Sequence, residues 1–290
     1  MEEFGNLDRT MNEYGESLNF EEIFKNHKGF FSNKWIHYLY IYDRLFLEYR
    51  AKNKPITILE IGVDRGGSIE IWEKYFPKGS KIHGVDINPQ CKEIHFSENI
   101  TIHLGNASDR SFMEKTFENI EFDIILDDGS HICSDVIETF KIMFPKLKNG
   151  GLYVIEDMCA SYWANYGGGK RKKGSSIEYF KNLVEALNAD YLRPTSFLIR
   201  LIRYLFPGLK NKTDCIWKKY IDRKYFNKTD YPQTIESITF YDSICTIKKF
   251  SVPKNKPFQS VTTGRESIGK SNNFTNELEL IKSVKEMFGN

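Results

Sequence analysis

The chain of 290 residues predicts an α/β protein with a Rossmann-like, mostly parallel sheet. Short apolar runs of strand length alternate with helical segments between residues 56 and 157. Acidic residues directly follow two of these runs, and a glycine-rich turn follows the first. Strands that alternate with helices form βαβ units with a parallel sheet. Because ligands bind outside the carboxyl ends of such strands, that edge is the candidate site.

Five buried strands and several helices are expected in order along the chain. The strands cover 56–61, 81–86, 100–104, 122–126 and 151–155, and helices follow at 69–75 and 133–147. Helices rich in aromatic side chains are expected at 20–28 and 35–49, so residues 1–50 would form an N-terminal helical cap. The runs 237–241 and 244–248, joined by Asp242-Ser243, indicate an antiparallel hairpin at the sheet edge.

The alternation of strands and helices stops in the second half of the chain. We expect one domain over 51–252 with an inserted lid or acceptor region at about 160–235, followed by a polar tail at 253–290. The insertion contains a glycine-rich basic loop at 166–174, a helix at 176–188 and an apolar helix at 196–206. Lys170 to Lys173 are either a lid over an anionic acceptor or a solvated charge run. The 196–206 helix packs on the core or a partner, or lies on a membrane surface.

The composition argues against several classes of protein. The formal net charge of +2 is too small to favour binding to nucleic acid. No apolar run reaches the length of a transmembrane segment, and the acidic start lacks an apolar signal region. The five cysteines include no C-x-x-C pair, which argues against a zinc site and a disulfide scaffold. We therefore expect a cytoplasmic protein.

The first predicted strand leads into a turn that suits a ligand. Glu60, Gly62, Gly66 and Ser68 lie where this strand passes into a helix. Glycines there let the backbone approach a ligand, and the helix N-terminus favours negative charge. Asp86 ends the next strand, where its carboxylate can accept hydrogen bonds from both hydroxyls of a ribose. NAD enzymes and methyltransferases share this pattern, and a plain α/β turn would also produce it.

Acidic residues directly follow the fourth and fifth predicted strands. Asp127, Asp128 and His131 follow the fourth strand, and Glu156 and Asp157 follow the fifth. Hard oxygen donors suit a divalent cation, and a neighbouring imidazole suits a general base. The alternatives are a turn whose carboxylates cap the next helix, a solvated strand end, and a structural histidine.

Taken together, the motifs resemble the class I S-adenosylmethionine-dependent methyltransferases. More narrowly, the chain is similar to the macrolide-sugar O-methyltransferases of the mycinamicin and macrocin types, and to the cephalosporin hydroxylase-like and rhamnosyl O-methyltransferase group. The matching motifs are Leu59-Glu-Ile-Gly62, Gly84-Val-Asp-Ile87, Gly105-Asn-Ala-Ser-Asp109, Asp127-Asp-Gly-Ser-His131, Val154-Ile-Glu-Asp157, Ser161-Tyr-Trp163 and Ser237-Ile-Thr-Phe-Tyr-Asp-Ser243. The first motif departs from the family by carrying Asp64 where glycine is common.

The resemblance implies an Mg²⁺-dependent O-methyltransferase that uses S-adenosylmethionine. The cofactor would be bound by residues of the glycine-rich turn and the next three strand ends, namely Glu60, Gly62, Gly66, Ser68, Asp86, Asn106, Ser108 and Asp127. Asp128, Glu156 and Asp157 would bind Mg²⁺, and His131 would be the catalytic base. The implied acceptor is a sugar hydroxyl on a surface polysaccharide, a nucleotide-sugar or a glycosylated natural product, and the implied assembly is a homo-oligomer.

Two other functions compete with this interpretation. An NAD-dependent sugar oxidoreductase would place a Tyr-x-x-x-Lys pair on a helix, whereas Tyr166 and Lys170 lie in a glycine-rich loop. A non-catalytic cofactor-binding scaffold in glycan assembly would bind cofactor without turnover. Tyr162 and Trp163 either form a wall of the acceptor pocket or pack in the protein, and core packing is the favoured role of Tyr38.

Overall fold

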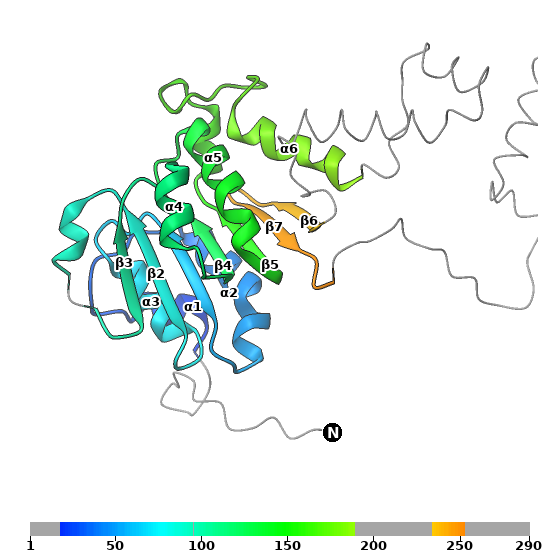
Figure 1. Cartoon of the computed structure of the whole chain (residues 1–290). Helices are drawn as coiled ribbons and strands as arrows, with labels where there is room; N and C mark the ends of the chain where they lie inside the picture. The colour runs from blue at the N-terminus through cyan, green and yellow to red at the C-terminus, as the bar shows by residue number, and fades with distance from the viewer. Residues whose placement is uncertain (1–17, 95, 189–233, 253–290) are drawn as a thin grey trace, which may run out of the picture. The chain divides into compact units, whose positions relative to one another are not determined.

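A seven-stranded sheet lies at the centre of the residues that the computed structural model describes, which are 18–94, 96–188 and 234–252 (Figure 1). The strands are β1 (Thr57–Ile61), β2 (Lys81–Asp86), β3 (Ile100–Leu104), β4 (Phe122–Asp127), β5 (Leu147–Ile155), β6 (Ile235–Phe240) and β7 (Cys245–Lys249). Their order across the sheet is β3-β2-β1-β4-β5-β7-β6. The first five strands are parallel, and β7 and β6 form an antiparallel edge. The predicted fold class and edge hairpin are therefore confirmed.

The register of the central strands brings their carboxyl ends to one level. Asp127 of β4 lies opposite Ile61 of β1 and Ile155 of β5. The ladder continues for one residue more, because the Asp128 N–H donates to the Ile61 carbonyl at 2.9 Å and the Glu156 N–H donates to the Asp127 carbonyl at 2.9 Å. The acidic residues after β4 and β5 therefore start from adjacent points at the same edge of the sheet.

Three helices cover each face of the sheet (Figure 1). The helices α1 (Phe20–Lys25), α2 (Ile36–Ala51) and α3 (Gly67–Tyr75) pack on one face. The other face carries α4 (Arg110–Thr116), α5 (Cys133–Met143) and α6 (Ser176–Leu187). Short 3-10 turns lie at Pro89–Lys92, Phe144–Lys146, Met158–Tyr162 and Ala164–Tyr166.

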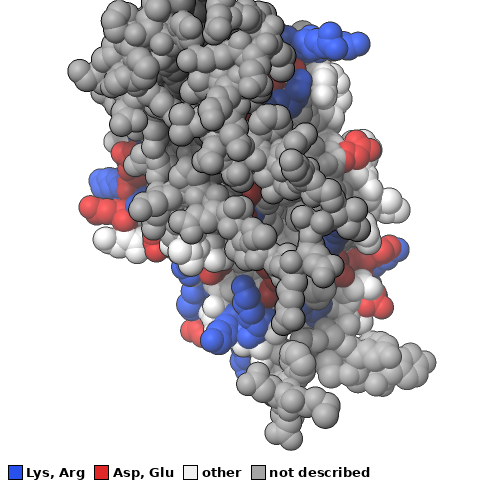
Figure 2. Space-filling model, turned by 90° about the vertical axis from the view of Figure 1, so that its right-hand side faces the viewer, with Lys and Arg blue, Asp and Glu red and all other residues white. Residues whose placement is uncertain are grey.

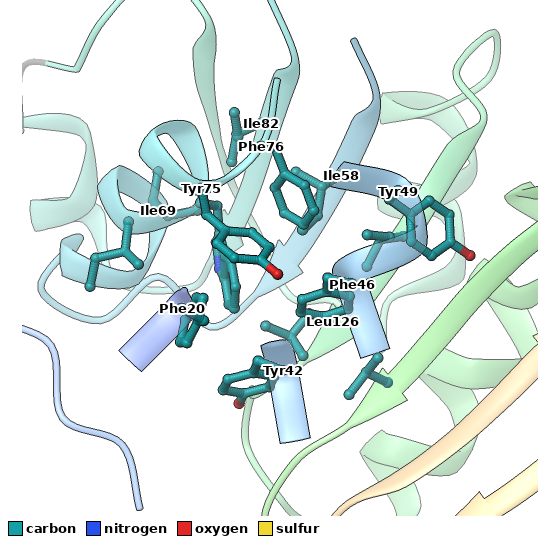
Figure 3. Close-up of a cluster of buried hydrophobic side chains, with 14 of the residues drawn as sticks. Phe20, Tyr42, Phe46, Tyr49, Ile58, Ile69, Tyr75, Phe76, Ile82 and Leu126 are labelled. Carbon is teal, nitrogen blue, oxygen red and sulfur yellow. The ribbon is translucent and has the colours of Figure 1, made fainter. Parts of the chain in front are cut away.

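An aromatic cluster fixes the N-terminal helices to the sheet (Figure 3). The ring of Phe20 stacks on Trp72 with centroids 4.9 Å apart, and Tyr42 meets Trp72 edge-on at 5.4 Å. Such buried aromatic pairs are stabilising beyond the area that they bury. The helix α2 is thus fixed against α3, and its N-terminal end is placed near the end of β5, where Tyr38 donates a hydrogen bond to Asp157.

Two features of the fold differ from the predicted elements. The helix predicted over 133–147 ends at Met143, and β5 begins at Leu147 instead of 151. Pro145 explains the early end of the helix, since proline lacks the N–H that a continuing helix requires and its ring clashes with the preceding turn. The strand begins early because Leu147 pairs with Phe122 across an irregularity in the ladder. The helix α4 was not predicted because it has only 7 residues, although Asp109 caps it by accepting from the Phe112 N–H.

Other predictions concern segments outside the described residues. These are the helix expected at 196–206, the tail at 253–290 and much of the insertion. None of the helices within the described ranges has both the length and the apolar character needed to cross a membrane. Where the face drawn in Figure 2 is coloured, basic and acidic residues are interspersed, in keeping with the nearly balanced composition.

Candidate active site

A cavity of about 370 Å³ opens at the carboxyl ends of β1, β2, β3 and β4. Its lining includes six of the residues predicted to bind cofactor or metal, namely Gly62, Asp86, Asn106, Ser108, Asp127 and Asp128. These residues come from four different strand ends, which the parallel register brings to one level. We call this space the donor cavity.

Gly62 makes the floor of the donor cavity possible. Its φ is +90°, and a Cβ atom there would lie 2.2 Å from the Asp128 carbonyl oxygen. Only glycine allows both this backbone conformation and so close an approach of the two chain segments. The structure therefore requires glycine here for the approach of two chain segments, and the predicted approach to a ligand stays a prediction.

Asp86 organises the turn after β1 from the neighbouring strand. Its Oδ2 accepts from the N–H groups of Val63 at 2.8 Å and Asp64 at 3.0 Å, and its Oδ1 accepts from the Asn88 N–H at 2.7 Å. A carboxylate has about four acceptor positions. Three positions hold the backbone in place and the Cys91 thiol lies next to the same carboxylate, so at most one position is left for a ligand, whereas the predicted pair of ribose hydroxyls would need two.

Asp127 brings a buried carboxyl group to the same cavity. The side chain is 3% exposed, and its oxygens receive long hydrogen bonds of 3.4 Å from the Gly129 N–H and the Tyr153 hydroxyl. Burial raises the pKa of Asp127 to about 7. A cationic group in the donor cavity would stabilise its ionised form.

The other predicted cofactor residues lie away from the lining of the donor cavity. Glu60 is fully buried on the α3 side of β1, where its Oε2 accepts from the Ser68 hydroxyl at 2.9 Å. Burial raises the pKa of Glu60 to about 7, and Oε1 has no hydrogen-bond partner in the described part of the chain. Gly66 precedes α3 with a φ of +86°. The structure therefore places these three residues behind the turn.

A second cavity of about 400 Å³ lies beside the ends of β4 and β5. It is lined by Asn33, Lys34, Trp35, Tyr38, Asp128, Glu156 and Asp157. Asp128 lines both cavities, so the two spaces adjoin at this residue. We call the second space the acidic cavity.

Three of the predicted side chains converge beside the acidic cavity. Ligand atoms of Asp128, His131 and Asp157 all lie within 4.8 Å of one another. The His131 Nε2 lies 3.9 Å from Asp128 Oδ1 and 3.6 Å from Asp157 Oδ2. Asp157 is also held by Tyr38, whose hydroxyl donates to its Oδ1 at 2.7 Å. Tyr38 therefore both packs in the core, as predicted, and orients an acidic residue.

Lys34 is the member of this site that the sequence did not reveal. Its Nζ donates to both oxygens of Glu156, at 3.0 and 2.8 Å, and forms a close ion pair with Asp128. The side chain is only 6% exposed. Burial opposes the charged form, but Glu156 and Asp128 together raise the pKa of Lys34 above its ordinary value. The residue stands in an irregular segment 94 positions from Asp128, with no motif to mark it.

The donor set fits a hard divalent cation. Asp128, Glu156 and Asp157 offer three carboxylates, and the Lys34 ammonium supplies a single positive charge. Burial and the nearby Asp128 raise the pKa of Glu156 despite the Lys34 ammonium, as expected where carboxylates outnumber positive charges. Carboxylate oxygens are the ligands that Mg²⁺ prefers. The residues present therefore suit this ion.

Aromatic side chains border the site beyond His131. The ring of Tyr166 lies 6.4 Å from that of His131, and Trp163 lies 5.9 Å from Tyr166. Tyr162 and Trp163 are each about half exposed, at 52% and 51%. The rings of Tyr166 and Trp163 therefore form an aromatic wall next to the imidazole. The adjoining residues Lys170 to Lys173 are exposed and not helical, so Tyr166 and Lys170 do not form a helical pair.

Residues 59–158 match the family model Methyltransf_24, described as a methyltransferase domain. The match covers 100 of the 290 residues, so the chain is similar to this family over its central part. Its relatives include the mycinamicin VI 2''-O-methyltransferase of Micromonospora griseorubida, 38% identical over 163 residues that make up 52% of this chain and 39% of the relative. The demethylmacrocin O-methyltransferase of Streptomyces fradiae is 36% identical over 52% of this chain and 40% of its own length. The predicted resemblance is therefore confirmed.

A solved structure supports the same fold assignment. The MycE methyltransferase from the mycinamycin biosynthetic pathway, in complex with Mg and SAH, superposes with a TM-score of 0.59 at 26% identity. The match covers 75% of this chain and 51% of that chain. The chain spans only about two fifths of the length of the curated relatives described above.

Proposed function

We propose that this protein is an S-adenosylmethionine-dependent O-methyltransferase that acts on a sugar hydroxyl. The observation that carries the proposal is the junction of two cavities at Asp128. One cavity has the residues expected to bind a nucleoside, and the other has carboxylates beside an imidazole. A methyl donor in the donor cavity and an acceptor hydroxyl in the acidic cavity would thus lie on the two sides of Asp128.

The donor cavity is assigned to S-adenosylmethionine. Asp86 has at most one acceptor position for a ribose hydroxyl, Asn106 and Ser108 lie where the adenine is expected, and Asp127 would hold the cationic amino group. The complex of MycE with SAH supports this choice of cofactor. We assign Glu60, Gly66 and Ser68 to the support of the turn that faces the methionine part.

The acidic cavity is assigned to activation of the acceptor. A sugar hydroxyl is a weak nucleophile at neutral pH and needs to lose its proton as the methyl group is transferred. His131 would take that proton, a role that typically contributes about a hundredfold to ten-thousandfold in rate. Asp157, 3.6 Å from the imidazole, would stabilise the protonated ring. Asp128, Glu156 and Asp157 would bind Mg²⁺, which when bound polarises and orients the hydroxyl.

The proposed acceptor is a glycosylated small molecule. Trp163 and Tyr166 form an aromatic wall next to His131, and such a surface can pack against the apolar face of a sugar ring. We propose that the exposed Tyr162 extends this surface. The relatives are named for methylation of mycinamicin VI and demethylmacrocin. We further propose that residues 51–252 form the methyltransferase domain, that residues 1–50 act as its cap, and that the protein assembles as a homo-oligomer.

Two measurements test the proposed function. Calorimetry should detect binding of S-adenosylmethionine and none of NAD. Transfer of a labelled methyl group should then be assayed on a panel of glycosides, with matched aglycones as controls. We expect methylation only of the glycosides, loss of activity with EDTA and recovery with Mg²⁺. Activity indifferent to chelation would refute the metal assignment, and methylation of the aglycones would refute the sugar acceptor.

A further inference from the structure

An irregular segment between α1 and α2 carries Lys34 into the acidic cavity. We call residues 26–35 the strap. Glu70 of α3 holds its first half, because Glu70 Oε2 accepts from the Phe30 N–H at 2.8 Å and lies 3.2 Å from His27 Nε2. The strap also lies directly against Gly67, where a Cβ atom would be 2.4 Å from the Phe30 carbonyl oxygen. Both halves of the strap are thus anchored, the first by α3 and the second by Lys34.

Lys34 binds the same carboxylates that would hold a metal ion. Its three donors are all used, two on Glu156 and one on Asp128, and its side chain is 6% exposed beside a Glu156 side chain that is 1% exposed. The residues with ligand atoms already close together are Asp128, His131 and Asp157, without Glu156. Glu156 is therefore turned toward the ammonium in this arrangement.

An ammonium and a divalent cation exclude each other on these oxygens. Mg²⁺ requires ligand oxygens at about 2.0–2.1 Å. An ion that bound both Glu156 and Asp128 would lie within a few ångströms of Nζ, where two like charges repel strongly in a partly buried site. The acidic cavity gives the lysine an alternative location, since Asn33, Trp35 and Tyr38 line it next to Lys34. Lys34 can therefore leave without unfolding the strap.

We propose that Lys34 is a tethered cation that occupies the metal site in the metal-free protein and competes with the divalent cation for Glu156 and Asp128. The inference rests on the proposed metal site and adds a residue that sets its affinity. Without metal, the ammonium keeps two buried carboxylates together. With metal, the lysine is displaced, and the strap loses its second anchor.

Titration calorimetry with Mn²⁺ on the full chain tests the competition. Lys34→Met removes the charge while keeping most of the aliphatic stem, and Lys28→Met changes an exposed lysine of the same strap. We expect Lys34→Met to bind Mn²⁺ about 10- to 100-fold more tightly than the wild type, a range typical of coupling between competing ligands. Lys28→Met should match the wild type. Equal or weaker binding by Lys34→Met would overturn the proposal, whereas no binding by either protein would overturn the metal site itself.

Proteolysis of the wild type gives a second readout that does not depend on how a variant folds. Trypsin cleaves after lysine, and Lys34 is buried in the metal-free arrangement. Cleavage after Lys34, followed by mass spectrometry, should increase several-fold when Mn²⁺ is added. Asp128→Asn, which weakens the metal site, should abolish this increase. Protection of Lys34 by Mn²⁺ would contradict displacement.

Discussion

His131 Nε2 lies 3.6 Å from Asp157 Oδ2, and both residues have left-handed backbone conformations, with φ values of 56° and 50°. Such conformations are uncommon for residues other than glycine, and they concentrate at functional sites. The two residues follow different strands, β4 and β5, which pair in parallel. The backbone strain therefore serves to turn an imidazole and a carboxylate toward each other.

The first prediction concerns the proposed base. His131→Asn should fold and bind SAH as the wild type does, because asparagine tolerates the left-handed conformation better than most residues. Methyl transfer should fall by about 10²- to 10⁴-fold, the usual contribution of a general base. Turnover with saturating cofactor is the measurement, and calorimetry with SAH is the control. An unimpaired rate would remove His131 from the mechanism.

The second prediction concerns Gly62, with Gly79 as its matched control. Both have positive φ, at +90° and +85°, but an added Cβ lies 2.2 Å from the Asp128 carbonyl oxygen at Gly62 and 3.6 Å from Pro55 at Gly79. Gly62→Ala should lower the free energy of unfolding by about 3 kcal/mol and abolish SAH binding. Gly79→Ala should cost about 1 kcal/mol through backbone strain alone and retain SAH binding. Thermal unfolding and calorimetry would separate the two effects.

The third prediction follows from the raised pKa of Asp127. The folded-state pKa is about 7, against 3.8 for the free side chain, so the folded protein holds a proton that the unfolded chain releases. Between pH 3.8 and 7 the unfolded chain is stabilised by releasing this proton while the folded protein retains it, so the free energy of unfolding of the cofactor-free protein falls as the pH rises. Asp127→Asn should therefore stabilise it by about 2 kcal/mol more at pH 8 than at pH 5.

The same substitution should weaken SAH binding about tenfold, since the proposed partner of the amino group is lost. The half-exposed Asp135 lines the same cavity and provides the control. Asp135→Asn should show no such gain in stability at pH 8. If the free energy of unfolding of Asp127→Asn changed with pH as that of the wild type does, this account would be contradicted.

The fourth prediction concerns a pair of imidazoles on β2 and β3. His83 Nδ1 lies 3.1 Å from His103 Nε2, and burial together with this neighbour lowers the pKa of His83 to about 4. Because the pKa of His83 is 6.5 in the unfolded chain and about 4 in the folded protein, the unfolded chain takes up this proton at a higher pH. The free energy of unfolding therefore decreases as the pH falls from 6.5 toward 4.

The test compares the pH dependence of unfolding in wild type and His83→Gln. Because the ring is only partly buried and solvent screens it, we expect the pair to account for about 1–2 kcal/mol of the loss between pH 7.5 and pH 4.5. The variant should lack that part of the loss. His37→Gln, whose ring contacts the Asp242 carbonyl instead of another imidazole, should keep the wild-type dependence.

Local patterns were sufficient to predict most of the sheet. Buried strands read as apolar runs, and the acidic residues that end β4 and β5 lie together because parallel strands end at one edge. The same reasoning predicts that Asp128, His131 and Asp157 lie together, as their ligand atoms do in the structure. It also placed the edge hairpin, which needed only two alternating runs and a turn.

The rest depended on contacts between segments far apart in the chain. Lys34 reaches Asp128 across 94 positions and Glu156 across 122, and Tyr38 reaches Asp157 across 119. No periodicity links such residues, because their meeting is set by how α2 and the strap pack on the sheet. Glu60 differs for another reason: alternation along β1 turns its side chain to the α3 face, away from the donor cavity.

Asp128 belongs to the walls of both cavities, which has a thermodynamic consequence. A nucleoside in the donor cavity and an ion in the acidic cavity would share the Asp128 carboxylate, so each changes the electrostatic field at the other. Linkage then requires reciprocity: if an ion on one side tightens the hold on a nucleoside by some factor, the nucleoside tightens the hold on the ion by the same factor. Calorimetric titrations performed in both orders would measure that common factor.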